Sequence, residues 1–363
     1  MLTAAKRREL ETKGYTVLHN VISCDDCDKY RSQFDDWLTQ FKDGDWPISS
    51  HSLIQRYRAG HMEPTWAVRL QAKAVFAQLW ETNELLSSFD AIAIGRPPED
   101  GEEEFSNPDK HWLHCDQSVA RVGLHAYQGG VYLEDAEEDD WTLAVLEGSH
   151  KLHLDFFEAH PKARMRITIN AHYTLKDSEV EWYTRHARVA RKRVPVPKGG
   201  MVLWDSRLIH ANARPIKGRR NPGRWRYVVF VCMAPEVWAS KEYIKAKQRA
   251  FWNLSTTSHW PCDGIQCFSD DPINSQKVKS IQELPESAKT DDAKRLAGVL
   301  PYRRRTVLWG SGTKSADIAK PEWAVGSQEW RKQQQKYHLS KWSFMAFGVF
   351  LGAFVCFLLS VLM

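Results

Sequence analysis

Cysteine is scarce in this chain and irregularly spaced. The 363 residues contain seven cysteines, an odd number without a repeated spacing. Cys24 and Cys27 form a single Cys-x-x-Cys, and no second pair completes a tetrahedral zinc site. This usage excludes a small secreted domain built on disulfides and is typical of a protein kept in a reducing compartment.

An excess of charge of one sign is also lacking. The chain has 50 basic and 45 acidic residues, a net charge of +5, and the two signs are interspersed. No basic face for a nucleic acid is therefore expected. An N-terminal signal peptide is also not expected, because the segment from Met1 to Lys13 is rich in charge.

What the chain does contain is a short cluster, His114-Cys115-Asp116, and a histidine far downstream, His210. In an extended segment, the i, i+2 spacing places His114 and Asp116 on the same side, so both can reach one ion. Two imidazoles and one carboxylate occupy one face of an octahedral metal and leave three positions open. This is the ligand set of non-haem Fe(II) oxygenases, so the pattern predicts a metal site of His114, Asp116 and His210.

A His-x-Asp tripeptide is a weak pattern by itself, and the chain contains a second one, His153-Leu154-Asp155. The second tripeptide lies in the polar stretch 151–160, which is predicted to be a helix or loop. The first tripeptide is preferred because an extended segment directs both of its side chains to one side.

His210 follows a turn at Lys198-Gly199-Gly200 and the apolar run 201–204, a predicted buried strand that continues through Leu208 and Ile209. A histidine at the end of a buried strand is often a packed or hydrogen-bonded core residue. That alternative is weakened by the arginines that open the next strand.

Alternation in this next strand places Arg226 on one face with Val228, Phe230 and Cys232. A buried guanidinium requires an anion. The carboxylate of a 2-oxo acid would serve, held by a bidentate fork, and a structural ion pair with Asp205 is the alternative.

Four segments, in this order, resemble the phytanoyl-CoA dioxygenase family over roughly residues 10–240. They are Gly14 to Ile22, His114-Cys115-Asp116, Gly148-Ser149-His150-Lys151, and Gly200 to His210. The resemblance implies a mainly β fold, a cupin-like jelly roll or double-stranded β-helix, with the metal at its open mouth. It also implies that His114, Asp116 and His210 bind Fe(II), with 2-oxoglutarate and O2 as co-substrates and ascorbate as reductant.

The family's arginine for 2-oxoglutarate usually follows the distal histidine by about eleven residues, where this chain has Asn221. The substitutes at hand are Arg219, Arg220, Arg224 and Arg226. Matching the downstream strand to the family selects Arg226, with Arg224 second. The resemblance also places Asn212 and Gln128 beside 2-oxoglutarate and gives His150 a structural role.

Length and composition predict one oxygenase domain, residues 1–270, followed by a polar tether, residues 271–341. Two amphipathic helices, one capped by Ser23 and one over 67–80, are expected to buttress one sheet. The acidic segment 134–140 is expected to be a solvated loop. The aromatic segment 251–268 is expected to pack on the jelly roll and is a candidate substrate lid.

The C-terminal segment 342–363 predicts a transmembrane helix and a single-pass tail anchor. Phe344 to Met363 is a run of 20 residues without charge, long enough to cross about 30 Å of hydrocarbon. Basic residues precede the run and none follows it, so the catalytic domain is predicted to face the cytosol. The sequon Asn253-Leu254-Ser255 would be modified only if the domain were luminal.

Small residues recur every four positions in this segment, namely Gly348, Gly352, Cys356 and Ser360. Such a stripe lets two helices approach closely and allows a homodimer. The alternative is that small residues are simply common in membrane helices.

Three functions are consistent with the sequence. The favoured one is a membrane-anchored Fe(II)/2-oxoglutarate hydroxylase acting on a small, hydrophobic or lipid-derived molecule. The second is an oxygenase fold without catalysis that serves as a binding or scaffold protein, for which the displaced arginine is the argument. The third is hydroxylation of a peptide or protein, because fold does not fix function.

Overall fold

The computed structural model describes residues 1–302, except 42–44, 120, 122, 167–171 and 269–279. These residues belong to one compact unit, Met1–Thr313. The predicted anchor 342–363, its small-residue stripe and most of the predicted tether lie outside the described residues. In the part of the chain that is described, no helix is both long and apolar enough for a membrane span.

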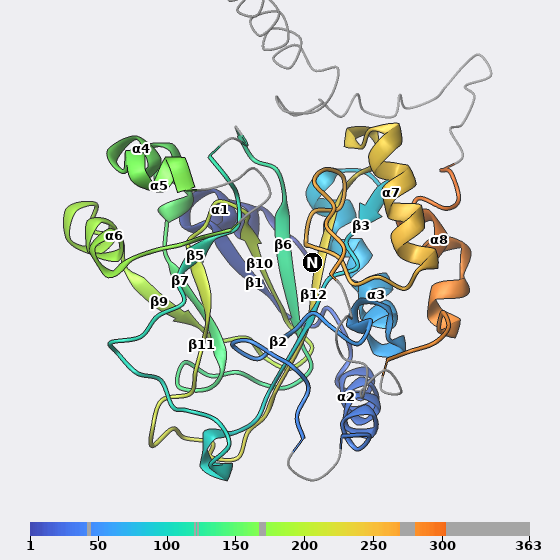
Figure 1. The fold of residues 1–363 in the computed structure, drawn as a ribbon, viewed down its shortest axis with the longest axis horizontal. Helices are drawn as coiled ribbons and strands as arrows, with labels where there is room; N and C mark the ends of the chain where they lie inside the picture. The colour runs from blue at the N-terminus through green and yellow to red at the C-terminus, as the bar shows by residue number, and fades with distance from the viewer. Residues whose placement is uncertain (42–44, 120, 122, 167–171, 269–279, 303–363) are drawn as a thin grey trace, which may run out of the picture. The chain divides into compact units, whose positions relative to one another are not determined.

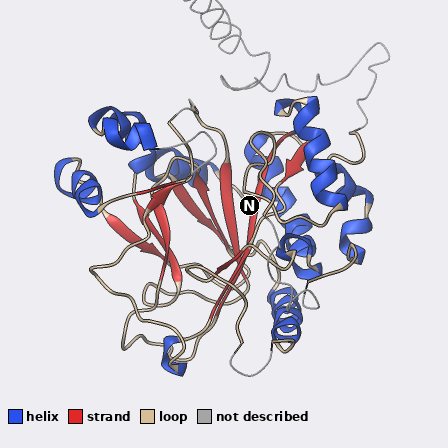
Figure 2. Cartoon of the chain, in the orientation of Figure 1, coloured by secondary structure: helices blue, strands red, loops and turns tan. Residues whose placement is uncertain are grey.

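Two antiparallel sheets form the centre of this unit (Figures 1 and 2). The first follows the order β1-β10-β6-β12-β4-β2, with β3 also paired to β12. Its strands are β1 (Tyr15–Leu18), β10 (Met201–Asp205), β6 (Tyr127–Tyr132), β12 (Arg226–Pro235), β4 (Ile92–Gly95), β2 (Leu53–Ile54) and β3 (Leu85–Ser87). The second follows the order β8 (Tyr173–Thr174), β5 (His114–Cys115), β11 (His210–Ala213), β7 (Thr142–Leu146) and β9 (Arg191–Val194). The prediction of a mainly β fold of two antiparallel sheets is confirmed.

Alternation along β10 shows how the sheets pack. Met201 and Leu203 point to an outer core shared with helices, whereas Val202 and Trp204 belong to the core between the sheets. The inner core also contains Leu143 and Val145 of β7 in the second sheet, together with Val228 of β12 in the first sheet. The two sheets therefore face each other across one apolar interior, and this interior leads to the predicted site.

Helices cover the outer faces of both sheets. α2 (Cys24–Leu38) begins at Ser23, whose hydroxyl accepts a hydrogen bond from the Asp26 amide, and α3 (Glu63–Trp80) packs beside it. Both bury an apolar face against the first sheet, as predicted. α1 (Ala4–Lys13) precedes β1. On the second sheet lie three short helices, α4 (His153–Ala159), α5 (Pro161–Arg166) and α6 (Asp177–Glu181).

The compact unit extends beyond the predicted domain end at residue 270. α7 (Lys241–Trp252) and α8 (Asp291–Leu296) lie on the same side as α3 (Figure 1). Ala288, Ala293 and Ala297 are buried with Trp66 and Phe251 in one cluster. The Tyr302 hydroxyl donates to the Leu85 carbonyl at 2.7 Å. The described part of the predicted tether, residues 280–302, is thus packed against the domain.

One strand assignment needs correction. The sequence predicted a single strand that continues to His210, but β10 ends at Asp205 and His210 begins β11. A turn at Ser206–Arg207 carries the chain from the first sheet to the second. Leu208 and Ile209 lie between this turn and β11 and are buried, so their apolar character resembles a continued strand. The crossing brings His210 beside β5.

Candidate metal centre

β5 and β11 place two histidines next to each other. His114 and His210 are paired in the antiparallel register, and their ring centroids are 4.4 Å apart. Asp116 follows β5, and its carboxylate oxygens lie 3.5 Å from His114 Nε2 and 3.3 Å from His210 Nε2. The three ligand atoms all lie within 4.8 Å of one another. The structure therefore brings together the three residues that the sequence predicted, within reach of one ion.

Alternation explains why Asp116 and His114 point to the same side. Cys115, between them, is buried in the outer core of the second sheet with Phe156 and Ile209. The competing His153 lies on α4, where its Nε2 contacts the Gln117 carbonyl at 2.9 Å. Of the described residues, only His114, Asp116 and His210 form a cluster with metal-ligand geometry.

Both imidazoles are oriented by backbone carbonyls. The Nδ1–H of His114 donates to Trp112 O at 2.8 Å, and that of His210 donates to Leu208 O at 2.9 Å. Since a carbonyl can only accept, each ring donates through Nδ1 and directs its Nε2 toward Asp116. Neutral imidazole nitrogens with one carboxylate fit Fe(II).

The protonation states agree with this ligand set. Burial lowers the pKa of His114 to about 3, so its ring is neutral near pH 7. Burial acts to raise the pKa of Asp116, but the imidazoles of His259, His114 and His210 hold it well below its usual range. The carboxylate is therefore ionised and able to bind a cation.

The triad opens on a cavity of about 550 Å³. Its walls carry several aromatic side chains, namely Trp112, Trp204, Phe230, Trp260 and Phe268. The segment predicted to pack on the jelly roll supplies one wall, through residues that include Ser258, His259 and Gln266. A cavity of this size accommodates a drug-sized molecule.

Arg226 is a buried cation next to this site, and only 2% of it is exposed. Its Nη2 donates to Asn212 Oδ1 at 2.9 Å, and Asn212 lines the cavity. Contacts to the Ser52 and Tyr132 hydroxyls are long, 3.4 and 3.5 Å, and Nε has no hydrogen-bond partner. Burial lowers the pKa of Arg226. A buried guanidinium beside the cavity has the geometry to bind a carboxylate.

A structural ion pair does not account for Arg226. Among the described residues no carboxylate lies within 4.0 Å of its guanidinium, and Asp205, the alternative partner, binds Arg207 at 2.6 Å. An isolated buried charge is costly, so an external anion is the remaining way to compensate it.

The family model for phytanoyl-CoA dioxygenase matches residues 10–217. The chain belongs to the phytanoyl-CoA dioxygenase family. Membership of this family supports the assignment of the chain as a dioxygenase-type enzyme. The matched segment contains β5 and β11, and therefore all three predicted metal ligands.

Relatives of the chain span most of its length. It is 25% identical over 276 residues to "Ava biosynthesis cluster protein O" of Aspergillus versicolor, covering 70% of this chain and 85% of that protein. The solved structure of GlcNAc Inducible Gene 2 of Candida albicans has a TM-score of 0.58 at 15% identity, covering 83% of this chain and 77% of the other. At that identity the likeness shows the fold alone. A structure of EctD from S. alaskensis with 2-oxoglutarate and 5-hydroxyectoine has a TM-score of 0.43 at 16% identity, covering 65% of this chain and 77% of the other.

Gln128 was predicted to contact 2-oxoglutarate, and the structure places it on β6 at the cavity. Its Nε2 donates to Asp116 Oδ2 at 3.0 Å. The amide therefore orients the carboxylate whose other oxygen faces His114. Such partners fix the ligand that they contact.

Replacing Gln128 with leucine is expected to weaken metal affinity by about 10- to 100-fold, because Asp116 loses its hydrogen-bond donor. Anaerobic titration of the full-length protein with Fe(II) measures the change. Gln266→Leu is the matched control, since Gln266 lines the same cavity without contacting the triad. Equal affinities of the two variants would contradict this role for Gln128.

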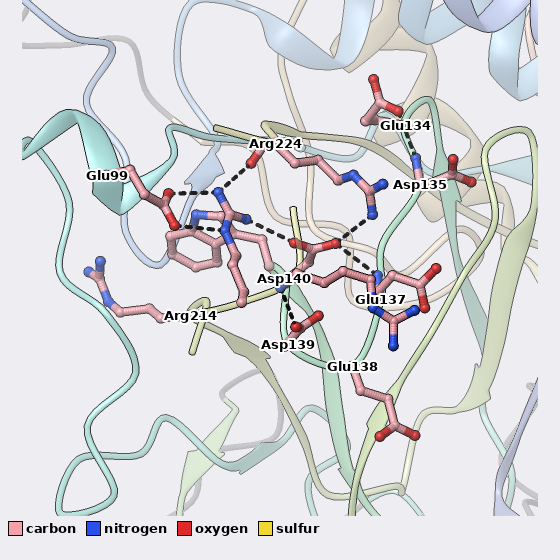
Figure 3. A network of polar contacts seen from close by, with 12 residues as sticks. Glu99, Glu134, Asp135, Glu137, Glu138, Asp139, Asp140, Arg214 and Arg224 are labelled. Carbon is pink, nitrogen blue, oxygen red and sulfur yellow. Dashed lines mark hydrogen bonds and ion pairs between the residues drawn. The ribbon is translucent and has the colours of Figure 1, made fainter. Parts of the chain in front are cut away.

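The other candidate arginines belong to an ion network outside the cavity (Figure 3). Arg219 binds Asp140 at 3.0 Å and Glu99 at 2.8 Å, and Arg224 binds the other oxygen of Asp140 at 2.7 Å. Arg224, the second choice for 2-oxoglutarate, is therefore engaged by Asp140. The backbone amide of Arg220 donates to Asp139. Of the four substitutes, Arg226 alone contacts a cavity residue through its guanidinium.

This network also corrects the expectation of a solvated loop at 134–140. Asp140 is 2% exposed and holds two guanidinium groups.

Asp140→Asn is expected to lower the free energy of unfolding by about 3–5 kcal/mol, because it leaves the buried Arg219 without its full counter-charge. Urea denaturation measures this loss. Glu137→Gln, at an exposed position of the same loop, should change it by less than about 0.5 kcal/mol; a similar loss in both variants would rule out a specific network.

Sequence reasoning missed Asp90 and did not recognise His259 as a site residue. Asp90 lines the cavity just before β4, and no motif marks it. His259 lies in the aromatic segment 251–268, whose composition was the one signal of its position. Burial lowers the pKa of His259 to about 4, and its Nε2 has no hydrogen-bond partner among the described residues.

Proposed function

We propose that the chain is an Fe(II)/2-oxoglutarate-dependent dioxygenase that hydroxylates a small molecule. One observation carries the proposal: the triad of His114, Asp116 and His210 opens on the cavity where Asn212 contacts the uncompensated Arg226. Bound iron, 2-oxoglutarate and O2 would supply oxidative decarboxylation to succinate and CO2, coupled to hydroxylation of the substrate, with ascorbate as reductant.

The chain's own part in this reaction is to bind and to orient. His114, Asp116 and His210 would hold iron, while Gln128 fixes the carboxylate of Asp116. Arg226 would receive the distal carboxylate of 2-oxoglutarate, with Asn212 beside it. The aromatic walls would exclude water from the reacting centre.

The cavity also favours a small molecule over a peptide. Its volume of about 550 Å³ lies in the usual range for small-molecule sites. A relative of this chain is named for a biosynthesis cluster, which supports the same substrate class. The apolar segment 342–363 supports our proposal that the enzyme is tail-anchored with its catalytic domain in the cytosol.

Uncoupled turnover of 2-oxoglutarate tests the proposal without a known substrate. Full-length protein in a mild detergent would receive Fe(II), ascorbate, O2 and 2-oxoglutarate, and succinate would be quantified. We expect succinate that disappears when iron is chelated. Absence of succinate, together with absence of saturable Fe(II) and 2-oxoglutarate binding, would overturn the proposal and favour a scaffold.

A further inference from the structure

A second carboxylate faces the cavity besides the metal ligand Asp116. Asp90 immediately precedes β4, and its side chain is partly accessible through the cavity that the triad shares. Its Oδ1 accepts one hydrogen bond, from the Ala91 amide at 2.8 Å. Within the described part of the chain, no lysine or arginine forms an ion pair with it. Asp90 is therefore a cavity carboxyl without a paired cation within 4.0 Å among the described residues.

The backbone around Asp90 is fixed from two directions. The Phe89 amide donates to the Thr257 hydroxyl at 3.0 Å, and the Phe89 carbonyl accepts from the Thr257 amide at 2.8 Å. On the other side, the Ala91 carbonyl accepts from the Phe230 amide at 3.4 Å. Asp90 is thus held between β12 and the segment 251–268. A carboxylate held in this way is preorganised for a ligand.

The environment of Asp90 disfavours an isolated negative charge. Burial raises its pKa to about 7, and Asp116 adds to this increase, whereas Arg69 opposes it through a longer-range attraction. A cation placed against the carboxylate would remove this penalty. The raised pKa agrees with the geometry, because the side of the Asp90 carboxyl that is not covered by protein faces the cavity.

No described lysine or arginine lines the cavity. If the proposed function holds, ferrous iron and Arg226 together balance Asp116 and a 2-oxoglutarate dianion. Asp90 then remains as the uncompensated charge. An anionic substrate would be repelled by it, and a neutral one would leave it unpaired.

The remaining walls suit an organic cation. Trp112, Trp204, Phe230, Trp260 and Phe268 line the same space as Asp90. Aromatic faces attract cations through their quadrupole and also bury apolar carbon. A carboxylate together with several rings is the chemistry that recognises an amine on an apolar skeleton.

We propose that Asp90 binds a protonated amine of the substrate and that the enzyme acts on apolar or aromatic amines. This inference rests on the proposed function for its chemistry. The binding of the amine is a property of the cavity itself, so it can be measured without turnover.

Calorimetric titration of the full-length, metal-free protein tests the inference with matched pairs of probes. The pairs are tryptamine and tryptophol, phenethylamine and phenethyl alcohol, and adamantylamine and adamantanol. We expect at least one amine to bind about tenfold or more tightly than its alcohol, because only the amine pairs with Asp90. Equal binding within every pair, or no binding in any pair, would overturn the inference.

Variants test whether the preference for the amine over the alcohol depends on Asp90. Asp90→Asn should abolish it, Asp90→Glu should retain part of it, and Asp109→Asn, at an exposed loop position, should leave it unchanged. A preference that survives in Asp90→Asn would also overturn the inference. The wild-type comparison stands by itself if Asp90→Asn does not fold. Succinate formation without a preference for amines would contradict only the amine inference. A preference for amines without iron and 2-oxoglutarate binding would contradict the proposed function.

Discussion

Replacing His210 with alanine is expected to abolish iron-dependent succinate formation and to reduce iron affinity by more than about 100-fold. Loss of a group that merely orients a ligand costs about 10- to 100-fold, so loss of a ligand must cost more. His210 provides one of only two imidazoles that face Asp116 in the cluster, and its Nε2 lies 3.3 Å from the carboxylate. Succinate and anaerobic Fe(II) binding, both measured on the full-length protein, report the two losses separately.

His153→Gln is the matched control for this experiment. His153 belongs to the competing His-x-Asp tripeptide, is buried like His210, and contacts a backbone carbonyl instead of a carboxylate. The variant should retain iron affinity within about threefold, because His153 is not one of the three clustered ligands. Loss of iron binding in His153→Gln and not in His210→Ala would exclude the assigned triad.

The predicted metal ligands could be found in the sequence because two of the three are only two residues apart. The i, i+2 spacing of His114 and Asp116 directs both to one face, and burial of Cys115 on the other face is the expected consequence. His210 was identified from order and context, although the sequence did not reveal that the chain crosses between sheets just before it. The buried apolar residues between the turn and β11, Leu208 and Ile209, produced the pattern of one continuous strand.

The arginines and Asp90 could not be resolved from the sequence. Arg219, Arg224 and Arg226 are close together in the chain, and only tertiary pairing with Asp140 separates the first two from the third. Asp90 likewise has no motif, since its role depends on which segment covers it. Residues 280–302 appeared polar enough for a tether, yet a few small apolar residues suffice to pack them on the domain.

Arg226→Met is expected to weaken 2-oxoglutarate binding by about 2–5 kcal/mol, about 30- to 5000-fold, the usual cost of truncating one partner of a buried charge pair. Arg226→Lys should cost less, because it keeps the charge and loses the planar fork. Direct titration with 2-oxoglutarate in the presence of a catalytically inert divalent metal measures both changes. Succinate formation by the same variants should be restored in part by excess 2-oxoglutarate.

Arg224→Met is the matched control, two positions away in the same segment. Arg224 is bound to Asp140, so its loss should leave 2-oxoglutarate affinity within about threefold and instead lower stability.

Arg226→Met should have the opposite effect on stability. Without 2-oxoglutarate it removes a buried guanidinium whose Nε is unpaired, so the variant should unfold at a higher temperature than the wild type. Weakened co-substrate binding in Arg224→Met with unchanged binding in Arg226→Met would transfer the role to Arg224. A higher unfolding temperature in Arg226→Met would mean that Arg226 lowers the stability of the protein without 2-oxoglutarate, and that a bound carboxylate recovers this free energy.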